Sequence, residues 1–260
     1  AIAFLTGAII SVMVIFNTEL GAATSNSVSI LINQTVGIIF LSSVMLALPK
    51  DTRVNPPREK APWYMWFGGL FGLMVITCNY YSVRETGATI AMGAAVLGQC
   101  LAGLALDITG WMWMRKRAIS TRRAISIMVV AAGIAVMLLF TGEAINPLYA
   151  LLGIAAGIIT MVQMAYNSRF AAAKGAFFSA RQNVVSGLIG IALFAFLADA
   201  SGTFDALSHL GGVPFYAVVG GGILACFVVV ASNTIIPRIP GADSSALMSA
   251  GQVMAAAALD

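Results

Sequence analysis

The sequence predicts an all-α polytopic membrane protein made of two inverted five-helix repeats. Composition gives the first reason: of 260 residues, 60% are hydrophobic and only 9% are charged, and mean hydropathy is +0.93. A soluble domain carries about 25% charged residues, so lipid is the solvent for most of this surface. Backbone polar groups in lipid must be satisfied internally, and long continuous apolar runs favour helices over barrel strands. The second reason is an internal duplication.

The duplication is an ordered pattern that recurs about 150 positions further along the chain. Asn17 precedes Gly37 by the same number of residues as Asn167 precedes Gly187. Inverted repeats of membrane helices are typical of secondary transporters, whose substrate site lies at the interface between the repeats. The later matches keep the same order: Pro62 with Pro214, Gly68-Gly69 with Gly220-Gly221, Asn79 with Asn233, Gln99 with Gln252, and Asp107 with Asp260.

Nine apolar segments are long enough to cross a bilayer, which takes about 20 residues. In the first half we expect spans at Ile2–Leu20, Ser27–Leu48, Trp63–Ser82, Thr89–Leu106 and Ala124–Phe140. In the second half we expect them at Leu148–Phe170, Ala176–Ala198, Phe215–Ile236 and Ala242–Leu259.

The basic residues predict the orientation of these spans. The loops after the second, fourth, sixth and eighth segments hold 13 of the 14 Lys and Arg residues, and only Arg84 lies on the other side. Positive residues favour the cytoplasmic side, so the N-terminus and these loops are predicted to be cytoplasmic. Because each repeat has five spans, an odd number, the second copy is inverted.

The repeats predict the domain organisation as well. We expect a first five-helix repeat at 1–142 and a second, inverted repeat at 143–260. Asp107 is followed by a basic loop and a fifth helix, whereas the sequence stops at its counterpart Asp260. The chain therefore reads as nine helices of a ten-helix protein.

Amide side chains inside apolar segments are the candidate substrate-binding residues, because polar groups in a membrane interior are costly and mark pathways or sites. Gln99 and Gln252 are repeat mates near mid-helix and can each donate and accept hydrogen bonds. Interhelical hydrogen bonds that only hold the bundle together are the alternative for all of these side chains. The other candidates are Asn33, Gln34, Asn183, Gln163, Asn79 and Tyr80, and for the last two an interfacial aromatic belt is the alternative to an outer vestibule.

Three charged residues are candidates for coupling or gating. Glu19 and Arg169 occupy matching positions in the two repeats, and snorkelling into the headgroups is the alternative for both. Asp107 ends its segment, where a carboxylate opposes the helix macrodipole and needs a partner, so a structural ion pair is the alternative. Coupling to a proton or another cation stays open.

Enzyme activity is not predicted. The only histidine, His209, has no ligand set or nucleophile beside it in sequence, and the three cysteines lie in apolar runs without metal-ligand spacing. No Walker-type glycine loop is present, so ATP-driven transport has no support. We therefore expect no metal, no cofactor and no nucleic-acid partner.

Two stretches carry a family resemblance. Gly98-Gln99, followed by Asp107-Ile108-Thr109-Gly110, and Pro62-Trp63-Tyr64-Met65-Trp66-Phe67-Gly68-Gly69 resemble the YdcZ-like branch of the drug/metabolite transporter superfamily, some members of which are fused repeats. The small multidrug resistance proteins are a more distant resemblance. The resemblance implies an inner-membrane transporter of the inverted-repeat type.

The expected function is secondary active transport of small organic solutes, metabolites or drugs, across the bacterial inner membrane by alternating access. The expected partners are a small-molecule substrate and the lipid bilayer; a monomer is sufficient and a homodimer is compatible with the sequence. The alternative is a non-transporting helical membrane module, such as a channel-like pore or an assembly partner.

Overall fold

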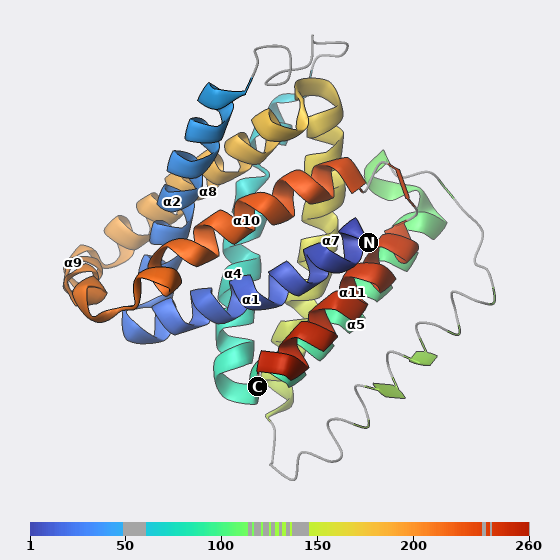
Figure 1. The fold of residues 1–260 in the computed structure, drawn as a ribbon, viewed down its shortest axis with the longest axis horizontal. Helices are drawn as coiled ribbons and strands as arrows, with labels where there is room; N and C mark the ends of the chain where they lie inside the picture. Colours follow the sequence, from blue (N-terminus) through green and yellow to red (C-terminus); the bar gives the residue numbers. More distant parts are fainter. Residues whose placement is uncertain are drawn as a thin grey trace.

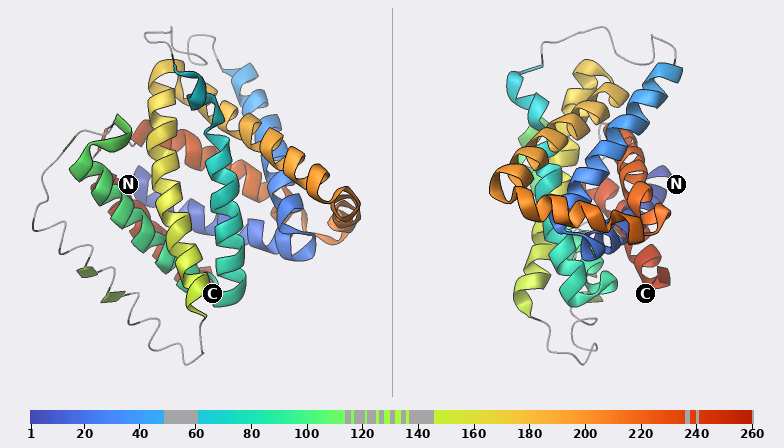
Figure 2. Two further views of the ribbon diagram at one scale, coloured as in Figure 1. Left: turned by 180° about the vertical axis from the view of Figure 1, so that it is seen from behind. Right: turned by 90° about the vertical axis from the view of Figure 1, so that its left-hand side faces the viewer.

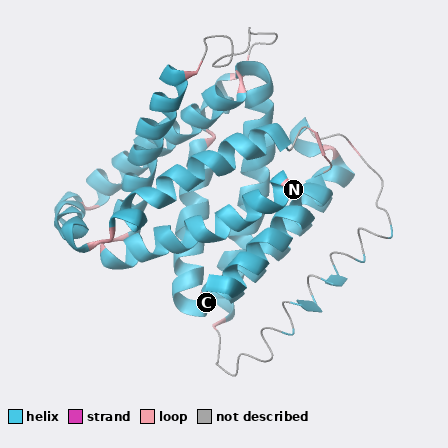
Figure 3. Cartoon of the chain, in the orientation of Figure 1, coloured by secondary structure: helices cyan, strands magenta, loops and turns pink. Residues whose placement is uncertain are grey.

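The described part of the chain is helical, as predicted. The computed structural model describes residues 1–48, 61–113, 146–235, 238–239 and 241–259, with isolated residues between 114 and 145. Figure 3 shows helices and loops in this part and no strand. The predicted span Ala124–Phe140 lies largely outside the described residues.

Eight long helices follow the predicted spans of the two repeats within the described residues. From the first repeat they are α1 (Ile2–Ala23), α2 (Asn26–Ala47), α4 (Gly69–Thr86) and α5 (Ala88–Thr109). From the second they are α7 (Pro147–Lys174), α8 (Ala176–Ala198), α10 (Phe215–Ile235) and α11 (Gly241–Leu259). The shorter elements are η1 (Trp63–Phe67), η2 (Trp111–Trp113), α9 (Ala200–Ser208) and η3 (His209–Gly212).

The third predicted span differs from the observed helix at both ends. Residues Trp63–Phe67 form the 3-10 helix η1, and the α-helix begins only at Gly69 and runs on to Thr86. Six helices in the described residues are long and apolar enough to cross a membrane, namely α1, α2, α5, α7, α8 and α10.

Short turns join consecutive helices. Gly87 ends α4 and precedes α5 with φ of 79°, and Gly175 joins α7 to α8 with φ of 97°, a region of backbone space that glycine enters without a Cβ penalty. The side chain of Ser25 accepts a hydrogen bond from the Val28 amide and caps α2. Asn146 caps α7 in the same way, one residue before a proline at the first helical position. The Gly87 and Gly175 turns thus join one long helix directly to the next.

Helices from the two repeats intermix in the packing. In the first repeat, α1 packs mainly on α10 and α11, and α2 packs on α8 and α10. The matching contacts of the second repeat place α7 on α4 and α5, and α8 on α4. Figures 1 and 2 show this arrangement, with α11 beside α5 in the first view and α7 beside α4 in the second. The described helices therefore form two groups, α1–α2–α10–α11 and α4–α5–α7–α8, each of which draws on both halves of the sequence.

Glycines bring these helices into backbone contact at equivalent places. A Cβ added to Gly157 of α7 would overlap the carbonyl oxygen of Ala95 on α5. Its mate Gly7 of α1 has the same relation to Met248 on α11. Small residues at a helix interface permit such close approach. Equivalent residues of the two repeats thus make equivalent packing contacts. The offset between them is 150 positions for α1 and α2 against α7 and α8, and 153 positions for α4 and α5 against α10 and α11.

Candidate functional site

A cavity lies at the centre of the helices and is the best-defined site within the described residues. The space between its side chains totals about 890 Å³, counting the gaps between atoms and the space open to solvent at its mouth. Each of the eight long helices contributes to its wall, so the cavity lies between the two packing groups. Its polar lining consists of Asn17, Asn33, Gln34, Asn79, Gln99, Thr160, Gln163, Asn167, Asn183, Ser232, Asn233 and Gln252.

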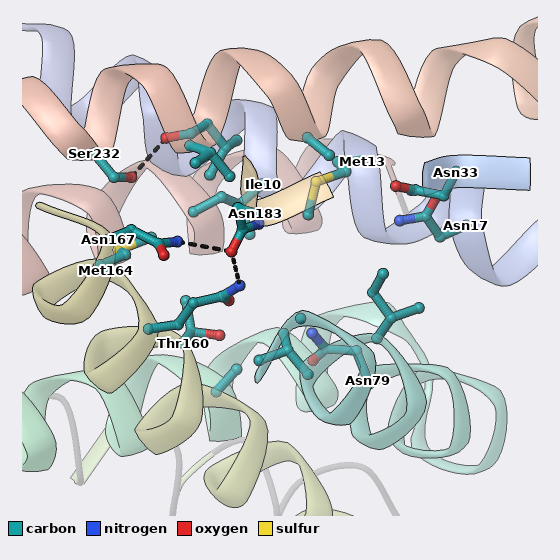
Figure 4. Close-up of a pocket in the computed structure, with 18 of the residues that line it drawn as sticks. Ile10, Met13, Asn17, Asn33, Asn79, Thr160, Met164, Asn167, Asn183 and Ser232 are labelled. Carbon is teal, nitrogen blue, oxygen red and sulfur yellow. Dashed lines mark hydrogen bonds between the residues drawn. The ribbon is translucent and has the colours of Figure 1, made fainter. Parts of the chain in front are cut away.

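Two asparagine pairs stand at opposite ends of the cavity (Figure 4). At one end Asn33 of α2 donates from Nδ2 to Asn17 Oδ1 of α1 at 2.7 Å. At the other end Asn167 of α7 donates from Nδ2 to Asn183 Oδ1 of α8 at 3.0 Å. All four are at least 93% buried. The pairs tie the first two helices of each repeat together in the same way.

The hydroxyl groups of two serines repeat this symmetry. Ser29 donates to the backbone oxygen of Asn17 at 2.7 Å, and Ser179 donates to that of Asn167 at 3.0 Å. Each asparagine backbone is thus fixed by the neighbouring helix, which leaves its side chain aimed in a defined direction.

Gln99 and Gln252 meet in the cavity wall. Gln99 Nε2 of α5 donates to Gln252 Oε1 of α11 at 3.3 Å, and both side chains are buried. The backbone oxygen of Gln252 also accepts from the Ser11 hydroxyl of α1 at 2.8 Å. The two glutamines touch, so they form one wall of the cavity where the two helices cross.

Gln163 breaks the symmetry of the site. Its Nε2 donates to Asn183 Oδ1 at 3.2 Å and to the Gly68 carbonyl oxygen at 3.3 Å, while its counterpart in the first repeat is Met13. The end of the cavity around Asn167 is therefore more polar than the opposite end.

Gln34 and Asn79 also line the cavity, and their hydrogen-bonding capacity is partly unused. The Gln34 amide makes no side-chain hydrogen bond to another described residue, although it packs beside Gly187. The Oδ1 atoms of Asn79 and Asn233 and the Nε2 of Gln252 are buried without a partner among the described residues. Unpaired buried polar atoms are costly, so these groups are available to a bound solute.

Tyr80 and the charged candidates lie elsewhere. Tyr80 donates from its hydroxyl to the Gly21 carbonyl oxygen at 3.3 Å; it is not in the cavity lining but lines a smaller space that adjoins the cavity between α1 and α4. Glu19 is half-buried, and its carboxylate accepts a hydrogen bond from the Tyr216 hydroxyl at 3.0 Å, which links α1 to α10. Arg169 is half-buried and Asp107 is buried, but neither is part of the lining.

The described lining therefore carries no formal charge. It contains ten carboxamide and two hydroxyl side chains, and the rest of it is apolar. In the part of the chain that the structure describes, no three His, Cys, Asp or Glu side chains are grouped closely enough to hold a metal ion. The chemistry that this site can offer is hydrogen bonding and apolar contact.

The two ends of the cavity are closed differently. Beyond the Asn167–Asn183 pair lies an aromatic cluster of Trp66, Phe71, Tyr166, Phe170 and Phe178, whose neighbouring ring centroids are 5.4–6.2 Å apart. The Tyr166 hydroxyl donates to the Tyr64 carbonyl oxygen and joins α7 to η1 there. At the other end a second, smaller space of about 260 Å³ shares Asn17 and Asn79 with the cavity and continues between α1 and α4. The aromatic cluster thus lies at one end of the cavity and the smaller space at the other.

Comparison with protein families matches residues 1–136 and 148–260 to DMT_YdcZ, whose description is "Putative inner membrane exporter, YdcZ". The chain belongs to the DMT_YdcZ family. Membership confirms the resemblance that the Gly98-Gln99 and Pro62-Trp63 stretches indicated. No curated protein matches the chain.

As a DMT_YdcZ member with several membrane-spanning helices, the chain is a multi-pass protein of the inner membrane and, at this general level, a transporter. The predicted cytoplasmic N-terminus stays a prediction.

Sequence reasoning missed several cavity residues of this DMT_YdcZ protein. Asn17 and Asn167 marked the repeat but were not selected as site residues, although each is a buried polar group within an apolar helix. Asn233 was noticed only as the mate of Asn79. With the packing offset of 153, however, the residue equivalent to Asn79 in the second repeat is Ser232, one position before Asn233. Repeated buried amides were the pattern that could have identified all of them.

Proposed function

We propose that this protein is a secondary transporter that moves a small organic solute across the inner membrane by alternating access, with the central cavity as its substrate site. The observation that carries the proposal is the position of the cavity between two groups of helices that are related by the inverted repeat. Inverted repeats place the substrate site near the bilayer midplane and allow one group to rock against the other.

The two ends of the cavity supply the gates that alternating access requires. The aromatic cluster closes the end that the basic loops predict to be cytoplasmic, and the second space extends toward the predicted outer face. In the other state, rocking of α1–α2–α10–α11 against α4–α5–α7–α8 would carry the aromatic cluster, whose rings all lie on η1, α4, α7 and α8, away from the first group and would close the gap between α1 and α4.

Glu19, Arg169 and Asp107 remain candidates for coupling or gating in this mechanism. Glu19 lies near the end opposite the aromatic cluster, where its bond to Tyr216 joins α1 to α10 within one packing group. Monomeric function is proposed, since one chain supplies all of the helices around the cavity.

Filling the cavity tests the proposal. Gly72 of α4 lines it, and a Cβ there would lie 3.2 Å from Gln163 Nε2 without meeting a backbone atom. Gly72→Leu is expected to abolish solute export from cells and flux in proteoliposomes while the protein still folds. Gly212→Leu is the matched control, because a Cβ at exposed Gly212 meets nothing within 4 Å. Undiminished flux in a folded Gly72→Leu protein would show that the solute takes another path, as expected of a non-transporting module or a peripheral pore.

A further inference from the structure

The described lining of the central cavity has no charged side chain, and this indicates what kind of substrate the cavity can hold. The inference rests on the proposed transport function. Ten carboxamides and two hydroxyls supply all of its described polar groups. The charged side chains that the sequence offered as partners, Glu19, Arg169 and Asp107, lie outside this lining.

A solute with a net charge would lose its hydration on entering and find no countercharge in the described wall. Removing an ion from water costs several kcal/mol unless it is paired. Amide oxygens could replace water around a cation, but they carry no formal charge, and three of the ten in the lining are already engaged. Asn17 Oδ1, Asn183 Oδ1 and Gln252 Oε1 each accept a hydrogen bond from another cavity side chain.

The unused groups indicate what a solute must offer. Asn79 Oδ1 and Asn233 Oδ1 are acceptors without a partner, and Gln252 Nε2 is a donor without one, among the described residues. A group that both donates and accepts, such as a hydroxyl or a carboxamide, matches this set. Apolar side chains, among them Met13, Met92 and Val228, fill the wall between the amides and suit an apolar body.

From this we infer that the cavity selects small uncharged solutes bearing hydroxyl or amide groups, and that their passage moves no net charge through the cavity. Transport of such a solute is insensitive to membrane potential unless an ion is coupled at a second site. It is also insensitive to pH near neutrality, because no described lining residue titrates there.

Two matched probe sets test the inference with the purified full chain in proteoliposomes. One set is nicotinamide, nicotinate and 1-methylnicotinamide, which are neutral, anionic and cationic on one ring. The other is N-acetylglucosamine, glucuronate and glucosamine. We expect the neutral member of at least one set to enter about tenfold faster than its charged partners, after subtraction of flux into empty vesicles. Its rate should not change under a potential of 100 mV, whereas a unit charge would respond by up to about fifty-fold.

The Gln99→Glu variant provides the second arm, because it places one carboxyl in the wall with little change of shape. Wild-type flux of the neutral probe should be flat from pH 6 to 8. Flux in the variant should fall as the carboxyl loses its proton, with the cationic probe gaining relative to the neutral one.

The outcomes separate the inference from the function on which it rests. Faster flux of a charged probe than of its neutral partner would overturn the uncharged-solute inference and leave the transporter intact. Absence of flux for all six probes, in vesicles whose protein elutes as a folded monodisperse species, would overturn the proposed transport function itself.

Discussion

Gln99 and Gln252 hydrogen-bond to each other, Nε2 to Oε1 at 3.3 Å, although they lie on α5 and α11 in different repeats. They occupy equivalent positions of the duplication, so the contact lies where an approximate two-fold axis crosses the wall of the cavity. A change of angle between α5 and α11 would alter this contact first. The pair can therefore contact the solute, and its hydrogen bond depends on the angle between the two packing groups.

Replacement of either glutamine by leucine is the first prediction. Gln99→Leu and Gln252→Leu keep an apolar chain of similar length but remove the amide. We expect transport to fall by about tenfold or more, because a polar solute left unpaired in a buried site loses about 1–3 kcal/mol of interaction. Folded yield should change little, since an interhelical hydrogen bond in a membrane protein is worth about 0.6 kcal/mol on average. Initial rates in proteoliposomes measure the effect.

The matched control for this pair is Leu101→Ala on the same helix as Gln99, because Leu101 is 43% exposed and lies outside the cavity lining. Its transport should stay near wild type. If both leucine variants transport normally and are well folded, the glutamines serve only to hold α5 and α11 together.

The fold class was predictable from the sequence because it depends on composition and repetition, and both are one-dimensional properties. The cavity was only partly predictable, since α1 and α2 are apolar around most of their circumference and no amphipathic pattern shows which side faces inward. The sequence correctly placed Glu19 and Arg169 within helices, but it did not show which side of its helix each residue occupies. Asn17 and Asn33 are hydrogen-bonded across two helices, a contact that appears only when the turn at Ser25 is known.

The asparagine pair Asn17–Asn33 should contribute to stability. Asn17→Ala removes the acceptor and leaves the Asn33 amide unpaired, at a cost of about 1–3 kcal/mol. The melting temperature in detergent should fall by about 2–4 °C for each kcal/mol in a protein of this size. The double variant Asn17→Ala/Asn33→Ala should lose less than the sum of the two single changes, because both act on one hydrogen bond.

Thr35→Ala is a suitable comparison for the asparagine variants. Among the described residues the Thr35 hydroxyl bonds only the Leu31 carbonyl oxygen of its own helix, so its loss should shift the melting temperature little. Strict additivity of Asn17→Ala and Asn33→Ala would contradict the structural coupling of the pair.

Close helix contact predicts that alanine is not tolerated at Gly157 or Gly7. A Cβ at either position would overlap the carbonyl oxygen of Ala95 or Met248 on the neighbouring helix, and backbone cannot rotate away as a side chain can. Overpacking costs about 1–3 kcal/mol and more when backbone must move. Gly157→Ala and Gly7→Ala should both lower the yield of monodisperse protein, whereas Gly211→Ala, which meets nothing within 4 Å, should not. Normal yield of both variants would show that α5–α7 and α1–α11 are further apart than described.

The inverted topology can be tested by cysteine labelling. Cys78, Cys100 and Cys226 are first replaced by alanine, and single cysteines are then introduced at His209 and Lys174. His209 is exposed between α9 and α10, and Lys174 ends α7 at the turn before α8. The basic-loop asymmetry predicts that His209→Cys reacts with a membrane-impermeant maleimide in intact cells, and that Lys174→Cys reacts only after the membrane is opened. Because one passage of a helix, α8, separates the two positions, they must lie on opposite faces if α8 crosses the membrane. Labelling of Lys174→Cys from outside, with His209→Cys protected, would reverse the orientation of the second repeat and put the aromatic cluster at the outer end of the cavity. Labelling of both from one face would contradict the predicted topology, because α8 would then not cross the membrane.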